Sequence, residues 1–213
     1  MDAEGERRIY HSPLRDRRAR ATRRNILTAA QQLISAQGYG STTMREIAAN
    51  AGVAVQTIYS SIGRKRDILS AFIDQMEDDA HLDQAEELFL STNDPREHLR
   101  LRAALSRRIF TAGIEVVEML LHATGTGTDI RNLLDEGDAR HRESCKIWMV
   151  DRWDDDVLRE GLTKEEAIDV IATLSGVDVY RWLVRRYAWP LDRYEEWLYR
   201  CMASDVLDDR HQD

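Results

Sequence analysis

The chain has 213 residues, 43% of them hydrophobic and 32% charged, which is the composition of a globular protein with one large or two small domains. Apolar runs stay well short of the ~18 residues that a transmembrane helix needs, and no apolar segment follows the arginine-rich N-terminus as it would in a secretory signal. We therefore expect a cytoplasmic protein without membrane association. In that compartment Cys145 and Cys201 stay reduced, so a structural disulfide is not expected.

Charge is unevenly distributed along the chain, whose net charge at pH 7 is −8. Residues 1–66 hold eleven arginines and one lysine against five acidic residues, a net charge of +7, so the remainder carries −15. This asymmetry indicates that the N-terminal part meets a polyanion and the acidic part does not. Only eleven glycines and three prolines are present, too few for the turns of an all-β fold, and an all-α fold is predicted.

The N-terminal residues 1–16 are predicted to form a disordered basic arm, with arginines at positions 7, 8 and 15. Such an arm can follow the DNA backbone or enter the minor groove, as in homeodomains. A loose tail without ordered contacts is an equal alternative for residues 1–12. A helix is then predicted from about Asp16 to Gln37, because apolar residues recur at helical spacing. Tyr39, between two glycines that end this helix, is expected in the core.

Residues 43–65 contain the most specific pattern in the chain. Thr43 and Glu46 form a capping box, which begins a helix. Gly52 permits the left-handed turn that ends it, and a second short helix resumes at Ala54 or Val55. Two short helices joined by a glycine turn make a helix-turn-helix. The second helix of such a pair lies in the major groove of DNA.

The second helix of this pair has one apolar and one polar side. Ile58 and Ile62 are four residues apart and anchor it to the core, whereas Gln56 carries an amide that can bind adenine through two hydrogen bonds. Hydroxyl and ammonium groups nearby can bind phosphates. The predicted DNA-binding residues are Arg24, Thr43, Val55, Gln56, Thr57, Tyr59, Ser60 and Lys65.

The pattern TTMREIAANAGVAVQTIYSSIGRKRDIL, residues 42–69, resembles the TetR family of bacterial repressors. By that resemblance Thr57 and Tyr59 bind phosphates, Lys65 contacts the DNA backbone, and residues 55, 56 and 60 face bases. The chain departs from the family at Ala54, where Ser or Thr is usual, and at Ile62, where Phe is usual. The first departure leaves the second helix without a side-chain cap.

The resemblance implies a helix-turn-helix domain at residues 17–66, followed by a C-terminal helical domain at 67–213 that binds a ligand and dimerises. A helix that belongs to both domains is predicted from Arg64, with an extension as far as Phe89. A second starts at Asp94-Pro95 and runs to about His122, with a kink expected at Gly113. After a loop at residues 125–127, further helices are predicted at 129–153, 163–189 and 191–207.

The C-terminal domain of the TetR family usually holds a small apolar ligand between its helices, in a pocket of aromatic and apolar side chains. The candidate ligand-binding residues here are Phe110, Met119, His122, Trp148 and Tyr180. Each of them also fits an ordinary core position.

The C-terminal segment VDVYRWLVRRYAWPLDRYEEWLYRCM, residues 177–202, is loosely similar to the last two helices of one TetR branch. There the two helices form a four-helix bundle across a two-fold dimer. The predicted dimer interface is Tyr180, Leu183, Val184, Tyr194, Trp197, Leu198, Cys201 and Met202. Burial of both helices within one subunit is the alternative.

Catalytic motifs are missing from the sequence: it has no H-E-x-x-H, no G-x-S-x-G and no Walker loop. The six histidines are scattered and the acidic run 154–156 is expected to be a solvated turn, so neither a metal nor a cofactor is predicted. The sequence predicts a homodimeric, DNA-binding transcriptional repressor that a small-molecule effector releases from a double-stranded operator. The alternatives are an all-helical ligand-binding protein or enzyme with a vestigial helix-turn-helix, and a DNA-packaging protein without sequence preference.

Overall fold

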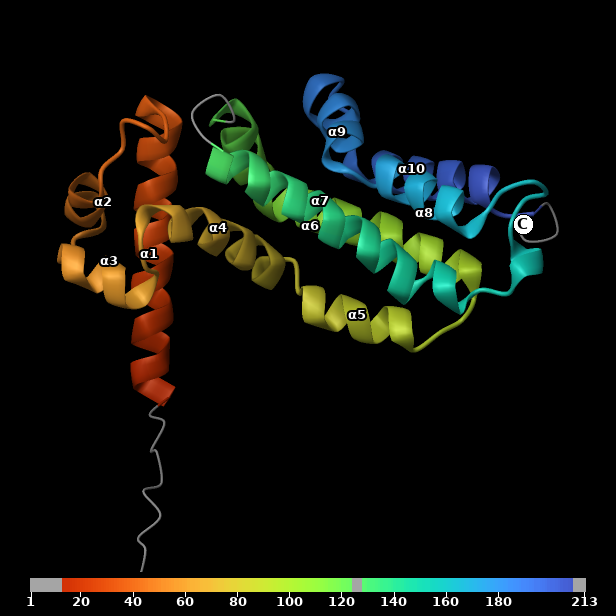
Figure 1. Ribbon diagram of the computed structural model, residues 1–213, viewed down its shortest axis with the longest axis horizontal. Coiled ribbons are helices and arrows are strands. Elements are labelled where there is room, and N and C mark those ends of the chain that lie inside the picture. The colour runs from red at the N-terminus through yellow and green to blue at the C-terminus, as the bar shows by residue number, and fades with distance from the viewer. Residues whose placement is uncertain (1–12, 124–127, 209–213) are drawn as a thin grey trace, which may run out of the picture. The chain divides into compact units, whose positions relative to one another are not determined.

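The computed structural model describes residues 13–123 and 128–208, and these fold into two compact units (Figure 1). The all-α fold is confirmed: within these ranges no β-strand forms, and the one isolated β-bridge joins Leu158 to Leu207. The first unit ends at Phe72 and the second begins at Ile73, so the boundary lies within a helix. It falls six residues after the predicted boundary.

The first unit contains α1 (Pro13–Gln37), α2 (Met44–Ala51), α3 (Val55–Ser61) and the first half of α4 (Lys65–Asp79). Helix α1 packs against both α2 and α3, and α2 against α3. Their apolar sides meet in one core, which includes the buried residues Ile26, Leu27, Ala30, Ile34, Ile47, Ala48, Ile58, Ile68, Leu69 and Phe72. Residues 13–16, assigned to the arm from sequence, belong to α1; residues 1–12 lie outside the described part of the chain.

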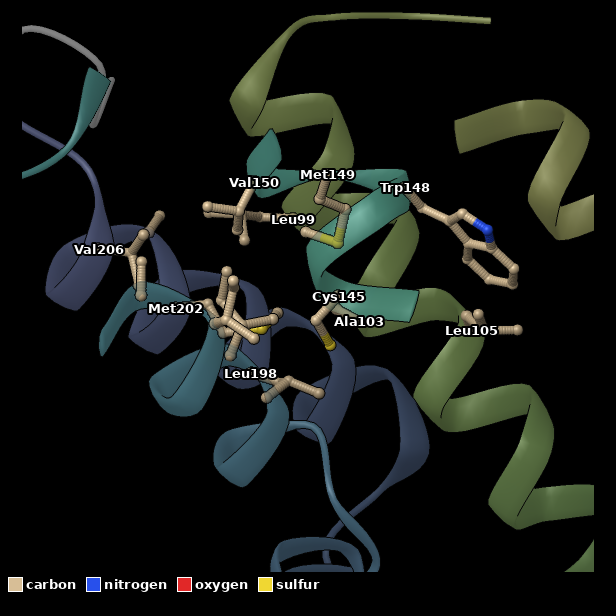
Figure 2. Packing of buried hydrophobic residues seen from close by; sticks show 14 of the residues in the cluster. Leu99, Ala103, Leu105, Cys145, Trp148, Met149, Val150, Leu198, Met202 and Val206 are labelled. Carbon is tan, nitrogen blue, oxygen red and sulfur yellow. The ribbon is translucent and has the colours of Figure 1, made fainter. Parts of the chain in front are cut away.

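The second unit is a layered helical bundle, made of α5 (Leu82–Leu90), α6 (Pro95–Ala123), α7 (Thr128–Trp148), α8 (Lys164–Leu174), α9 (Val177–Tyr180) and α10 (Leu191–Val206). Short 3₁₀ turns at Val150–Arg152 and Asp155–Val157 connect α7 to α8. Helix α10 packs on α6 and α8, and α7 on α8. Figure 2 shows the core that results, in which side chains of α6, α7 and α10 interlock.

Two long helices predicted from the sequence are broken in the structure. The extension of the fourth helix to Phe89 is wrong, because the chain turns at His81, whose φ of 53° cannot continue a right-handed helix. The predicted helix 163–189 is also divided. Ser175 and Gly176 separate α8 from α9, and a π-helix, η4 (Arg181–Arg186), follows α9.

Gly113, where the sequence predicts a kink, has a packing role in the structure. Helix α6 runs through it from Pro95 to Ala123 as one element. A Cβ atom at position 113 would lie 2.2 Å from Cγ and 2.3 Å from Sδ of Met76. The absent side chain therefore lets the C-terminal part of α4 approach α6 closely, as glycine does where two elements touch.

None of the helices in residues 13–123 and 128–208 is long and apolar enough to cross a bilayer. In the same ranges no cluster of three metal-binding side chains occurs. The cysteines Cys145 and Cys201 are both free thiols, the first buried and the second half-buried. The acidic turn at residues 154–156 is exposed, and Asp155 pairs with Lys164 at 3.0 Å.

Candidate nucleic-acid interface

The start of α2 is fixed by the predicted capping box. The Thr43 hydroxyl accepts the backbone N–H of Glu46 at 3.2 Å, and the Glu46 carboxylate accepts the backbone N–H of Thr43 at 2.8 Å. These bonds hold the pKa of Glu46 below its ordinary value, the Thr43 side chain being the largest cause. The Thr43 hydroxyl also donates to Glu46 at 2.8 Å. Its only proton is therefore committed to the cap, which weakens the case for a phosphate contact from this residue.

The turn between α2 and α3 depends on Gly52. Its φ of 67° and ψ of 33° are left-handed, and its N–H closes α2 onto the carbonyls of Ala48 and Ala49. The chain then re-enters a helix at Val55 without a side-chain cap, because Ala54 offers no acceptor. Ile58, fully buried, anchors α3 in the core.

Helix α3 presents a polar face to solvent. Gln56, Tyr59 and Ser60 are exposed, with 47% of Tyr59 accessible, whereas Val55 and Thr57 are half-buried. The Ser60 hydroxyl donates to the carbonyl of Thr57 at 3.2 Å and keeps its oxygen as an acceptor. A large exposed tyrosine beside an exposed glutamine on a short, anchored helix is an arrangement that can enter a groove of DNA.

Lys65 begins α4 and also fixes the loop that precedes α2. Its ammonium donates to the carbonyl of Tyr39 and, at 3.3 Å, to that of Gly40, and it lies 4.4 Å from the centre of the Tyr39 ring. Partial burial lowers the pKa of Lys65. An ammonium has three donors, so one N–H remains for a phosphate. Tyr39, predicted as a core residue, is half-buried under this cation.

Three arginines that the sequence interpretation left out belong to this region. Arg23 donates from Nη1 to the carbonyl of Ser61 at 3.3 Å and so ties α1 to the end of α3. Arg45 on α2 and Arg64 before α4 are exposed, as is the predicted contact Arg24. The charge count of the sequence could have pointed to these arginines, because each lies in or beside the helix-turn-helix.

The candidate ligand-binding residues of the second unit lie in different surroundings. The rings of Phe110 and Tyr180 pack at 5.3 Å, and that of Trp148 packs on Phe89 at 5.6 Å. Met119 is buried, but His122 is exposed and its Nδ1 lies 2.6 Å from the carbonyl of Glu118. An open depression of about 420 Å³ lies elsewhere, lined by Glu118, Arg181, Trp182, Arg185 and Arg186.

Half of the residues predicted for the dimer interface are enclosed within their own subunit. Tyr180, Tyr194, Leu198 and Met202 are buried in the core, and Tyr194 lies 2.8 Å from the Ser106 hydroxyl. Burial raises the pKa of Tyr194 to about 12. The other four, Leu183, Val184, Trp197 and Cys201, are half-buried and keep some surface for a partner.

The family model described as bacterial regulatory proteins of the tetR family matches residues 26–72. The match begins at the first fully buried residue of α1 and ends with the first unit, so it contains α2, α3 and the Gly52 turn. This domain belongs to the TetR family. It makes the chain a DNA-binding transcriptional regulator, as the sequence predicted. The chain matches none of the curated proteins.

The TetR-like architecture extends beyond this domain. NalD, the secondary repressor of the MexAB-OprM multidrug efflux pump in Pseudomonas aeruginosa, superposes with a TM-score of 0.73 at 20% identity, over 91% of this chain and 99% of its own. The SmeT–triclosan complex superposes with a TM-score of 0.71 at 18% identity, over 90% of this chain and 94% of its own. A putative transcriptional regulator from Saccharomonospora viridis in complex with choline superposes with a TM-score of 0.64 at 21% identity. The superposition covers 88% of this chain and 98% of that regulator. At these identities the likeness shows a shared fold.

Proposed function

We propose that the chain is a homodimeric repressor that binds a near-palindromic operator through α3 and leaves it when a small molecule binds the second unit. The observation that carries the DNA-binding part is the exposed face of Gln56, Tyr59 and Ser60 on a helix that Ile58 anchors. Gln56 and Ser60 contact bases, and Thr57, Tyr59 and Lys65 bind phosphates. A protein that works on DNA in this way is cytoplasmic and needs no catalytic group.

The proposal of a dimer is supported by the exposed aromatic surface around η4. Trp182 and Tyr187 are 56% and 60% exposed, and their rings lie 6.0 Å apart. Trp189 and Trp197 pack edge to face beside α10. Exposed apolar patches of this kind mark contact surfaces. In the dimer, two copies of this surface meet about a two-fold axis, together with the half-buried Leu183 and Val184.

The two-fold axis determines the form of the operator. Two α3 helices related by it require inverted half-sites whose centres lie one helical turn of DNA, about 34–36 Å, or a multiple of it, apart. The effector acts by binding one arrangement of the two subunits more tightly than the other. Efflux-pump regulation and triclosan binding, which the names of NalD and SmeT describe, support a small organic effector for the present chain.

A gel-shift series tests the DNA-binding function against its alternatives. The DNA upstream of the chain's own gene is titrated with protein at 50 and 200 mM salt, with random duplex as competitor. We expect a specific complex that weakens steeply with salt, because arginine and lysine release counterions from phosphates. Binding that random DNA displaces equally well would indicate a packaging protein, and no binding at either salt concentration would indicate a vestigial helix-turn-helix.

A further inference from the structure

A buried arginine in the second unit has no negative partner among residues 13–123 and 128–208. Arg102, on α6, is 2% exposed, and its Nη2 donates to the Ser144 hydroxyl of α7 at 3.0 Å. Its guanidinium carbon lies 5.3 Å from the centre of the Phe89 ring of α5. Its Nε is buried and has no acceptor. Throughout residues 13–123 and 128–208 no carboxylate forms an ion pair with it.

The side chains around Arg102 supply no negative charge. The Ser144 hydroxyl donates to the carbonyl of His141 at 2.8 Å and only accepts from the arginine. His141, whose Nε2 lies 3.1 Å from both the Ala172 carbonyl and the Ser175 hydroxyl, has its pKa lowered to about 4 by burial and by the Arg102 charge. It is therefore neutral at pH 7. Burial raises the pKa of the neighbouring Cys145 thiol, which remains protonated.

Without a bound anion, the buried and unpaired charge of Arg102 lowers the stability of the folded protein. Arginine cannot release its proton under physiological conditions, and a buried charge is tolerated only when it is paired and hydrogen-bonded. A planar carboxylate matches the guanidinium fork through two parallel hydrogen bonds. Because the Nε–H of Arg102 has no acceptor, one edge of the guanidinium group can still bind a carboxylate.

The other side chains in this part of the second unit are apolar. Phe89 packs against the indole of Trp148, and Leu99, Ala103 and Cys145 are buried in the same cluster. Figure 2 shows Leu99 and Ala103 of α6 near Cys145 of α7 and Met149, which follows α7, whereas the Trp148 ring points away from them. An inorganic anion would lose its hydration shell here, and these apolar side chains would offer it no hydrogen bonds in return. An organic acid with an apolar body can pack against them.

We propose that Arg102, held in place by Ser144, anchors the carboxylate of a small organic acid, whose apolar body lies between α5, α6 and α7. The assignment rests on the proposed function in one respect: it names the chemical class of the effector that the second unit binds. It differs from the sequence-based candidates, since only Trp148 among them adjoins this site.

Matched pairs of acids and amides test the charge requirement. Benzoate, benzamide, octanoate, octanamide and inorganic phosphate are titrated into the full-length protein by isothermal calorimetry, without DNA. We expect at least one acid to bind about tenfold or more tighter than its amide, since a hydrogen bond to a charged group is worth that factor. Binding of phosphate alone, equal affinity for acid and amide, or no acid binding would overturn the proposal.

Two neutral replacements assign the effect to Arg102. Arg102→Met removes the charge, and Arg102→Gln keeps an amide donor for Ser144; both should weaken acid binding about tenfold or more and leave amide binding unchanged. Arg108→Met, at an exposed position of the same helix, is the control and should bind like the wild type. Unchanged acid binding by either folded Arg102 variant would refute the assignment.

Thermal unfolding distinguishes a ligand-anchoring role of Arg102 from a structural role of this residue. Without a ligand, the Arg102→Met protein should unfold at the same or a higher temperature, because an unpaired buried charge has been removed. Failure of both variants to fold would assign Arg102 to the fold and overturn the proposal. Because DNA is absent from these measurements, a failure to bind DNA refutes the proposed function separately from the acid site.

Discussion

The contact between Gly113 and Met76 predicts that Gly113→Ala changes the free energy of unfolding in opposite directions in the wild-type and Met76→Ala proteins. Replacing Gly113 with Ala adds a Cβ that would lie 2.2 Å from the Met76 Cγ. The change improves helix propensity by about 1 kcal/mol, but overpacking costs about 1–3 kcal/mol. We expect Gly113→Ala to lower the free energy of unfolding by about 1 kcal/mol in the wild-type background.

In a Met76→Ala background the Cγ and Sδ atoms are gone, and only the Cβ of residue 76 remains close, 3.1 Å from the added Cβ, which a shift of a few tenths of an ångström relieves. Gly113→Ala should there raise the free energy of unfolding by about 1 kcal/mol, which makes the coupling energy of the cycle about 2 kcal/mol. Met76→Ala alone should destabilise, because it removes packed apolar atoms.

The assay for this cycle is urea unfolding at fixed protein concentration, followed by tryptophan fluorescence. All five tryptophans lie between residues 148 and 197, so the signal reports on the second unit. An effect of Gly113→Ala that is equal in both backgrounds would show that the close approach of α4 and α6 does not explain this glycine.

Three further predictions concern other parts of the molecule. Ala54→Ser supplies the missing cap of α3 and should stabilise this helix by about 0.5–2 kcal/mol, seen as slower hydrogen exchange of its amides; unchanged exchange would contradict it. Tyr59→Phe removes one phosphate hydrogen bond and should weaken binding about fivefold on every DNA sequence, measured by fluorescence anisotropy; a loss confined to one sequence would contradict the assignment. The pKa of His141, about 4 in the folded chain against 6.5 in the unfolded one, means that the unfolded state binds its proton first as the pH falls. Stability should therefore drop by about 3 kcal/mol between pH 6.5 and 4, with a shallower drop in His141→Gln.

Short-range patterns in the sequence predicted the DNA-binding unit well. The Thr43–Glu46 capping box forms as expected, because its two partners are three residues apart and need no tertiary context. The Gly52 turn follows from the conformational freedom of glycine. These local signals fixed α2 and α3, and with them the exposed face of Gln56 and Tyr59.

The interior of the second unit was less predictable, because burial there depends on contacts between distant segments. The break at His81 occurs at a non-glycine residue with positive φ, which is uncommon even for histidine, so the composition gave no clear signal. The buried Arg102 was overlooked as one of many surface cations. A signal did exist: His98, Arg102 and Ser106 are spaced by four residues on the inward side of α6, and all three are buried. Polar residues that recur on an apolar helix face indicate a buried network.

The most direct test of the account is selection of a randomised duplex by the wild-type protein and by Gln56→Ala in parallel. The account predicts that the wild type enriches an inverted repeat with half-sites one helical turn, or a multiple of it, apart. It predicts that Gln56→Ala enriches the same repeat with relaxed preference at one base pair of each half-site. Identical enrichment by both proteins, or no enrichment by the wild type, would contradict the claim that α3 recognises DNA through its exposed face.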